Sequence, residues 1–252
     1  MGTGAITTSL DVAQLVLYAF WIFFAGLVYY LVRENHREGY PLDSDEGARI
    51  QGWPIPSPKT YKLPNGHEVQ VPNDRVSLQT LNATPTHRWA GSPYDPTGNP
   101  LLAGVGPGAW ADREDEPDLD YLGKPKILPL RALPDYGVDA KDFDPRGTEV
   151  LGAEGEVAGF VSDLWLDTSD VLFRYLQVSL KGSGRQVLLP INFVRIKRGQ
   201  PIKVDALYTH QFADIPGQKS PDLVTVLEEE KIVAYYGAGL LYADPQRAEP
   251  LI

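Results

Sequence analysis

The stretch that decides the fold is VAQLVLYAFWIFFAGLVYYLV, residues 12–32, an apolar run of 21 positions whose one conventionally polar side chain is Gln14. At a rise of about 1.5 Å per residue, a helix of this length is roughly 31 Å long, which matches the ~30 Å hydrocarbon core of a bilayer. The run therefore predicts one transmembrane helix.

The residues that flank this run indicate whether it is cleaved and in which orientation it crosses the membrane. A cleaved signal peptide has a basic leader, a shorter apolar core and a small-residue cleavage site, and residues 1–11 contain no Lys or Arg. We therefore expect the run to remain as a membrane anchor. Arg33, Arg37 and Arg49 follow it closely, and basic flanks stay on the cytoplasmic side, so we expect residues 33–252 to be cytoplasmic.

Arg33 and Arg37 have two interpretations. They could bind lipid headgroups, at about 1 kcal/mol per basic residue near an anionic surface. They could equally act as an orientation signal alone. The sequence leaves both open.

Composition excludes several classes of function. The chain has no cysteine, which rules out disulfides, thiolate metal sites and a cysteine nucleophile. Its four histidines show no HxxxH or HExxH spacing, so zinc catalysis is not expected. A formal net charge of −10 disfavours nucleic acid as a partner, because phosphate binding requires clustered Lys and Arg. The chain contains no GxSxG, GxxxxGK[ST] or GxGxxG motif, so ordinary enzymatic activity is not expected.

Residues 33–145 form a proline-rich segment that we expect to be extended and to lie on a surface. Fifteen of the 22 prolines fall between Pro41 and Pro134, where they break helices and central strands. Aromatic residues recur through the segment, so we expect it to pack against the following domain, other membrane subunits or both. Within it, residues 61–71 (YKLPNGHEVQV) predict a hairpin around Asn65 and Gly66.

Residues 146–252 predict a mainly-β domain closed by one helix. Short alternating segments indicate five strands that form a small antiparallel barrel, at residues 157–166, 174–180, 186–189, 192–196 and 202–204. Ser220, Pro221 and Asp222 indicate a helix start, and helical spacing continues to Gly237. The run EEEK at residues 228–231 is interpreted as a solvated face, with partner binding as the alternative.

Two acidic groups are candidates for proton chemistry. Residues 112–120 (DREDEPDLD) carry six carboxylates against one Arg, which is typical of a hydrated loop. Asp167 and Asp170, with Arg174, follow a strand at the edge of the predicted barrel. Partly buried carboxylates there could relay protons, because burial raises a carboxyl pKa while a neighbouring Arg stabilises the ionised form. A salt-bridged turn is the structural alternative.

Taken together in order, several strings resemble the H subunit of the purple-bacterial photosynthetic reaction centre. The resemblance spans nearly the whole chain, and its sheet domain is similar to a PRC-barrel. The strings are LDVAQLVLYAFWIFFAGLVYYL, RENHREGYPL, PTGNPLLAGVGPGAW, DPRG at residues 144–147, VSDLWLDTSD and EEEKIVAYYGAGLLYADPQRAEPL.

This resemblance implies a non-catalytic subunit that caps the cytoplasmic face of the L and M subunits, stabilises the quinone sites and conducts protons to the secondary quinone. It implies a bacterial inner membrane of the intracytoplasmic or chromatophore type, with residues 1–11 in the periplasm. Bacteriochlorophyll, bacteriopheophytin, quinones, non-haem iron and carotenoid would belong to partner subunits. Residues 12–32 agree, because they contain no histidine to ligate magnesium. A light-harvesting antenna, a cytochrome subunit and membrane lipids are further implied partners.

Carried over by position, the resemblance places the internal proton-relay acid on Asp170, its companion on Asp167, a nearby basic residue on Arg174 and an entrance acid on Asp120. Where some members have histidines after that acid, this chain has Leu122 and Lys124, so a histidine-gated entrance is not expected. Asp170 is also one methylene shorter than the glutamate often found there, so its relay would need an extra water.

A membrane-tethered PRC-barrel adaptor that binds a soluble partner is the alternative function. It predicts that the purified protein travels without pigment-bearing subunits. The reaction-centre interpretation predicts near-infrared bacteriochlorophyll absorption in the native complex.

Overall fold

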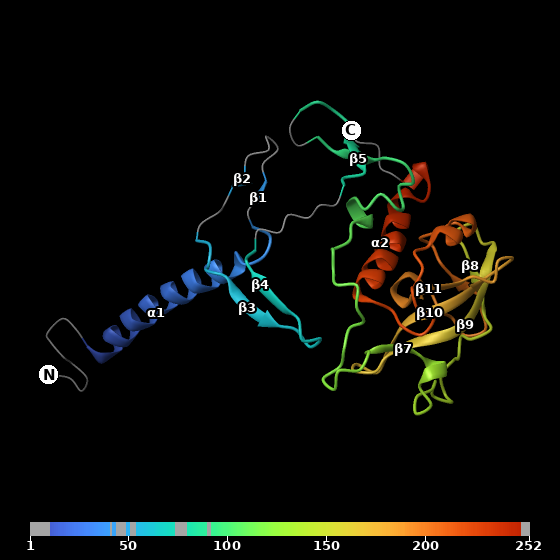
Figure 1. Cartoon of the computed structure of the whole chain (residues 1–252), viewed down its shortest axis with the longest axis horizontal. Helices are drawn as coiled ribbons and strands as arrows, with labels where there is room; N and C mark the ends of the chain where they lie inside the picture. The colour runs from blue at the N-terminus through green and yellow to red at the C-terminus, as the bar shows by residue number, and fades with distance from the viewer. Residues whose placement is uncertain are drawn as a thin grey trace. The chain divides into compact units, whose positions relative to one another are not determined.

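The apolar run forms helix α1, Val12–Asn35, in the computed structural model (Figure 1). Asp11 caps it, because its carboxylate accepts from the backbone N–H of Gln14 at 2.7 Å while the Gln14 side chain accepts from the Asp11 N–H at 3.2 Å. The single polar side chain of the run is therefore a helix cap. With a mean hydropathy of 2.2, α1 is long and apolar enough to cross a membrane.

The structure describes residues 11–40, 42–43, 49–50, 54–73, 80–89 and 92–247. The chain divides into two compact units, Met1–Val76 and Ser77–Ile252. Residues 1–10, which make up most of the segment expected in the periplasm, lie outside the described residues.

The first unit contains α1 and two short antiparallel hairpins. Strands β1 (Leu42–Asp43) and β2 (Arg49–Ile50) form one hairpin, and β3 (Lys59–Lys62) and β4 (Glu68–Val71) form the other. The second confirms the hairpin predicted at residues 61–71. Gly66 takes the positive φ of +85° that its turn requires.

The second unit is built on a six-stranded sheet, with a separate small hairpin of β5 (Ala83–Pro85) and β6 (Tyr94–Pro96). Neighbouring strands run in the order β11, β10, β9, β8, β12, and β7 pairs with β9. Their bounds are Gln186–Pro190, Leu172–Leu180, Val157–Asp167, Glu149–Leu151 and Ile202–Lys203, with β7 at Ile127–Pro129. The strands predicted at residues 157–166, 174–180, 186–189 and 202–204 are thus confirmed to within two residues.

Two strand predictions were wrong. Residues 192–196 are not a strand, because η3, a 3₁₀ turn at Ile191–Phe193, includes the first two of them and Arg195 forms only an isolated bridge with Lys203. The sheet is also not antiparallel throughout, since β12 pairs with β8 in parallel through Ile202 and Val150. The described part of the chain holds four further 3₁₀ turns: η1 (Gly106–Gly108), η2 (Leu130–Ala132), η4 (Thr209–Asp214) and η5 (Pro245–Arg247).

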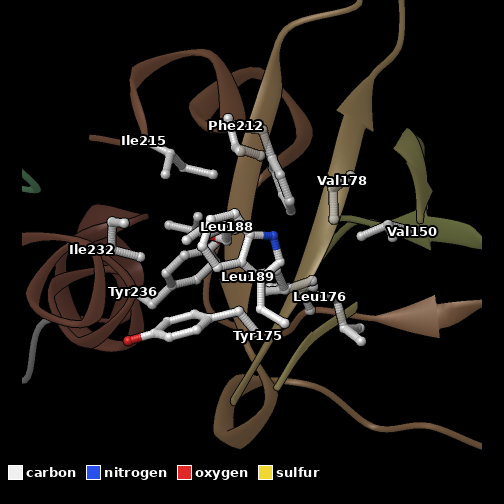
Figure 2. Packing of buried hydrophobic residues seen from close by; sticks show 14 of the residues in the cluster. Val150, Tyr175, Leu176, Val178, Leu188, Leu189, Phe212, Ile215, Ile232 and Tyr236 are labelled. Carbon is white, nitrogen blue, oxygen red and sulfur yellow. The ribbon is translucent and has the colours of Figure 1, made fainter. Parts of the chain in front are cut away.

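Helix α2, Val226–Tyr242, packs along the sheet (Figure 1). It starts four residues later than predicted at Asp222 and ends five after Gly237, because Thr225 and not Ser220 caps it, in a reciprocal capping box with Glu228. Figure 2 shows Ile232 and Tyr236 of this helix among the buried leucines of β11.

The proline-rich segment contributes aliphatic residues to the same core, whereas its aromatic residues Trp89, Tyr94 and Tyr121 are exposed, so the packing expected of its aromatic residues is not seen for these three within the described part of the chain. Leu101, Ile127 and Leu130 are buried in the cluster that also holds Trp165. The glycine-rich turn η1 lies directly on α2. A Cβ on Gly237 would lie 2.5 Å from the backbone oxygen of Pro107, so this approach requires a glycine.

Candidate functional site

The candidate site lies at the end of β9, where the chain turns into β10. Asp167, the last residue of β9, pairs with β7 on one side and with β10 on the other. Its side chain is only 5% exposed. One carboxylate oxygen accepts from the backbone N–H of Ser169 at 3.0 Å and of Asp170 at 3.3 Å, and the other accepts from Arg174 Nε at 3.4 Å. Asp167 is therefore a buried acid held inside a salt-bridged turn.

Asp170 lies in the turn itself and is exposed to solvent. The next residue, Val171, has a φ of +54°, a left-handed conformation that costs a β-branched residue about 1–2 kcal/mol. The turn thus presents an exposed carboxylate beside a strained backbone position. Such strain persists only where the surrounding structure fixes it.

A lysine on the neighbouring segment completes the charge arrangement. Lys126 Nζ lies 2.7 Å from a carboxylate oxygen of Asp118, and its backbone carbonyl accepts from the N–H of Thr168 at 2.9 Å. The hydrogen bond to Asp118 raises the pKa of Lys126, and the nearby charges of Asp167 and Asp170 add to that effect. The two aspartates predicted as relay acids therefore share one electrostatic environment with Lys126 and Asp118.

Asp120 belongs to the turn that precedes Lys126. One of its carboxylate oxygens accepts from the backbone N–H groups of Leu122 and Lys124, both at 2.8 Å. These bonds order the turn that carries Leu122 and Lys124. Asp120 is partly exposed, so it remains open to water on its other side.

Glu229 of α2 is a site residue that the sequence prediction missed. The hydroxyl of Tyr175 donates to Glu229 Oε2 at 2.6 Å. Burial raises the pKa of Glu229, while the Tyr175 hydrogen bond and the charge of Arg174 partly oppose that shift. The charges of Asp118 and Asp167 also raise it, which places Glu229 within reach of the same cluster. Burial and the Glu229 charge together raise the pKa of Tyr175.

The EEEK run is thus not a solvated face, and that interpretation was wrong. Glu228 caps its own helix by accepting from the N–H of Thr225 at 2.9 Å. Glu230 forms an ion pair with Arg113 at 3.6 Å, and the Lys231 ammonium lies 4.7 Å from the centre of the Trp110 ring. All four side chains of the run are therefore engaged within the second unit.

Arg37, near the end of α1, forms its hydrogen bonds within the first unit. Its guanidinium bonds Glu34 at 2.7 and 2.9 Å and the backbone carbonyls of Ser57 and Val71 at 2.9 and 3.1 Å. Its side chain is 8% exposed. Arg37 therefore ties α1 to the β3–β4 hairpin, and headgroup binding by Arg33 and Arg37 stays a prediction.

These features define a class: a protein with one apolar helix that can span a bilayer and a mainly-β unit with a partly buried acid cluster at its sheet edge. Residues 139–209 match the PRC-barrel domain. Residues 4–132, about half of the chain, match the photosynthetic reaction centre H-chain N-terminal region. The chain therefore belongs to the H-chain family of the photosynthetic reaction centre, a family of non-catalytic subunits that associate with the L and M subunits.

Proposed function

We propose that this chain caps the cytoplasmic face of the L and M subunits, stabilises the quinone sites and conducts protons to the secondary quinone. Family membership supports the assembly with L and M. One observation carries the proton-conducting role: exposed Asp170, buried Asp167 and partly buried Glu229 lie in one electrostatic cluster with Lys126 and Arg174. A proton path into a protein requires an acid at the surface followed by acids that are increasingly buried, and these three residues have that arrangement.

The chemistry follows from the environment of each carboxyl group. Asp120 and Asp170 are open to water and can take protons from it. Asp167 is buried next to Asp170: its carboxylate accepts from the backbone N–H of Asp170 at 3.3 Å and from Arg174. Glu229 can hold a proton near neutrality more readily than an exposed acid, because burial favours its neutral form. Water bridges the gap left by the short Asp170 side chain, and the path ends on the reduced quinone in the partner subunits.

The remaining assignments concern the assembly. Bacteriochlorophyll, bacteriopheophytin, quinones, non-haem iron and carotenoid are carried by partners, and α1 contributes no histidine to them. An antenna and a cytochrome subunit belong to the same complex. The N-terminus lies in the periplasm, the second unit lies in the cytoplasm, and the chain performs no catalysis of its own.

The proton role is tested by Asp170→Asn in the intact complex from native membranes. We expect slower proton-coupled transfer of the second electron to the secondary quinone and unchanged primary charge separation. Flash-induced absorption changes and proton uptake by a pH dye measure both. Asp142→Asn, at an exposed turn aspartate, is the matched control and should leave both rates unchanged. Wild-type second-electron kinetics in the Asp170 variant would exclude its role.

Glu229→Gln tests the inner part of the path. Gln keeps an acceptor for the Tyr175 hydroxyl but cannot carry a proton, so we expect slowed proton uptake with the complex still assembled. The near-infrared absorption of the purified complex reports assembly independently. If wild-type preparations of this chain showed no near-infrared pigment bands at all, the reaction-centre assignment itself would be contradicted.

A further inference from the structure

The hairpin of residues 195–203, which leads into β12, is a basic surface on an acidic chain. The backbone N–H of Arg195 donates to the carbonyl of Lys203 at 3.2 Å, and that of Gln200 donates to the carbonyl of Lys197 at 3.1 Å. These bonds, with Gly199 at a φ of +73°, fix a tight reversal. Four basic side chains project from it and are exposed: Arg195, Lys197, Arg198 and Lys203.

Two of these four cations form ion pairs, and they share a single carboxylate. Asp205 forms ion pairs with Arg195 at 3.3 Å and with Lys203 at 3.0 Å. Lys197 and Arg198, at the tip, take part in no ion pair or side-chain hydrogen bond within the described part of the chain. Beside them Ile196 is 37% exposed. The tip therefore offers two unpaired cations next to an apolar side chain, whereas the whole chain carries a net charge of −10.

We propose that this hairpin contacts the anionic phospholipid headgroups of the membrane that holds α1. Unpaired Lys and Arg attract lipid phosphates, and an apolar neighbour such as Ile196 suits the headgroup boundary. A soluble acidic partner would supply the same charge. The bilayer is favoured because α1 holds the chain permanently beside it, so even weak attraction acts at high effective concentration.

The expected effect is orientation and not independent binding. Each basic residue near an anionic surface gives a roughly five-fold preference, so two give about 30-fold. That is far too weak to recruit a free protein but enough to orient a tethered domain. The acidic remainder of the domain is repelled by the same surface, which adds to the bias. The inference rests on the membrane anchoring in the proposed function and not on the proton relay.

The absence of cysteine from the chain allows a clean test. Gln200→Cys in the full chain is labelled with an environment-sensitive fluorophore and inserted into nanodiscs. The discs contain phosphatidylcholine alone, or phosphatidylcholine with about a third of phosphatidylglycerol. We expect a blue-shifted, brighter emission in the anionic discs only. About 1 M salt should abolish it, because the Debye length falls to about 3 Å.

Two controls isolate the hairpin. Adding Lys197→Gln and Arg198→Gln should remove the shift, and a label at Ser183→Cys, on the exposed β10–β11 turn, should show none. Equal emission in both lipids, or a shift that survives the double substitution, would overturn the proposal. So would a shift that appears only when L and M subunits are added to neutral discs, since it would assign the hairpin to a protein partner. A chain that does not co-purify with discs would overturn the anchoring as well.

Discussion

The hydroxyl of Tyr175 on β10 donates to Glu229 Oε2 on α2 at 2.6 Å, and this bond connects the sheet edge to the helix that packs on it. In Figure 2 the Tyr175 hydroxyl points away from the buried leucines, towards the helix. The ring is buried in the core while its polar end contacts a carboxyl group. The pair therefore couples the core to the candidate site, and its titration should be measurable in the stability of the fold.

Glu229→Gln should make the stability of the protein less dependent on pH. Burial raises the pKa of Glu229 above its ordinary value of 4.5. Between pH 4.5 and the raised pKa, the folded state therefore binds more protons than the unfolded state. The free energy of unfolding consequently falls as the pH rises from about 4.5 to the raised pKa, and then levels off. The variant lacks this loss, so its stability relative to wild type should be higher at pH 8 than at pH 4. Urea unfolding in detergent, followed by tryptophan fluorescence, measures this.

Asp142→Asn serves as the control for that experiment, because the residue lies on an exposed turn outside the cluster. It should leave the pH profile as in wild type. Identical profiles for wild type and Glu229→Gln would show that the carboxyl group is not held in a buried environment.

Arg131→Ala should destabilise the second unit. Its guanidinium bonds Asp163 and Gln177, both at 2.8 Å, and the Asp163 side chain is only 8% exposed. Removal leaves a buried carboxylate without its cation, but Arg131 itself is 40% exposed, so water limits the loss to about 1–3 kcal/mol. Thermal unfolding measures the change. Asp222→Asn removes an exposed partner of the same arginine and should cost under about 0.5 kcal/mol, and an equal cost for both variants would contradict the role of Asp163.

Much of the fold was predictable because its signals are local. A run of 21 apolar residues is enough to specify α1, and Asn65-Gly66 is enough to specify a hairpin turn. The parallel pairing of β12 was not predictable, since Ile202 and its partner Val150 lie 52 positions apart in the chain and only two residues of each strand pair. The start of α2 was misplaced for another reason. The Thr225 to Glu228 spacing is itself a capping-box signal, and the Ser-Pro-Asp sequence before it was given priority.

The candidate site was predictable only where its residues follow a strand in sequence. Asp167, Asp170 and Arg174 lie around one turn, so the chain itself brings them together. Glu229 is about sixty positions further on and was hidden in a run of charges. One signal was present: Glu229 lies three residues after Val226 and three before Ile232, on the stripe that faces the core. A carboxyl group on an apolar stripe indicates a buried and perturbed acid.

Gly237→Ala should destabilise the contact between η1 and α2. Alanine raises helix propensity by about 1 kcal/mol, so without a steric conflict the substitution would stabilise α2. Its Cβ would instead lie 2.5 Å from the backbone oxygen of Pro107, which must move. We expect a net loss of about 1–2 kcal/mol in thermal unfolding. Val233→Ala, at a position of α2 that is 41% exposed, is the control and should stay within about 0.5 kcal/mol of wild type. A stabilised Gly237 variant would mean that η1 does not pack here.

Arg37→Ala should release the β3–β4 hairpin from the end of α1. The arginine bonds the carbonyls of Ser57 and Val71 while it remains paired with Glu34, so it joins three segments of the first unit. Without it, we expect faster amide hydrogen exchange in residues 59–71 and unchanged exchange within α1, because a helix satisfies its own backbone bonds. Exchange followed by mass spectrometry of the full chain in nanodiscs measures both. Arg33→Ala removes a charge at the same end of α1 and should leave the hairpin protected. Equal deprotection by the two variants would show that charge at this end of the helix, and not the Arg37 contacts, holds the hairpin in place.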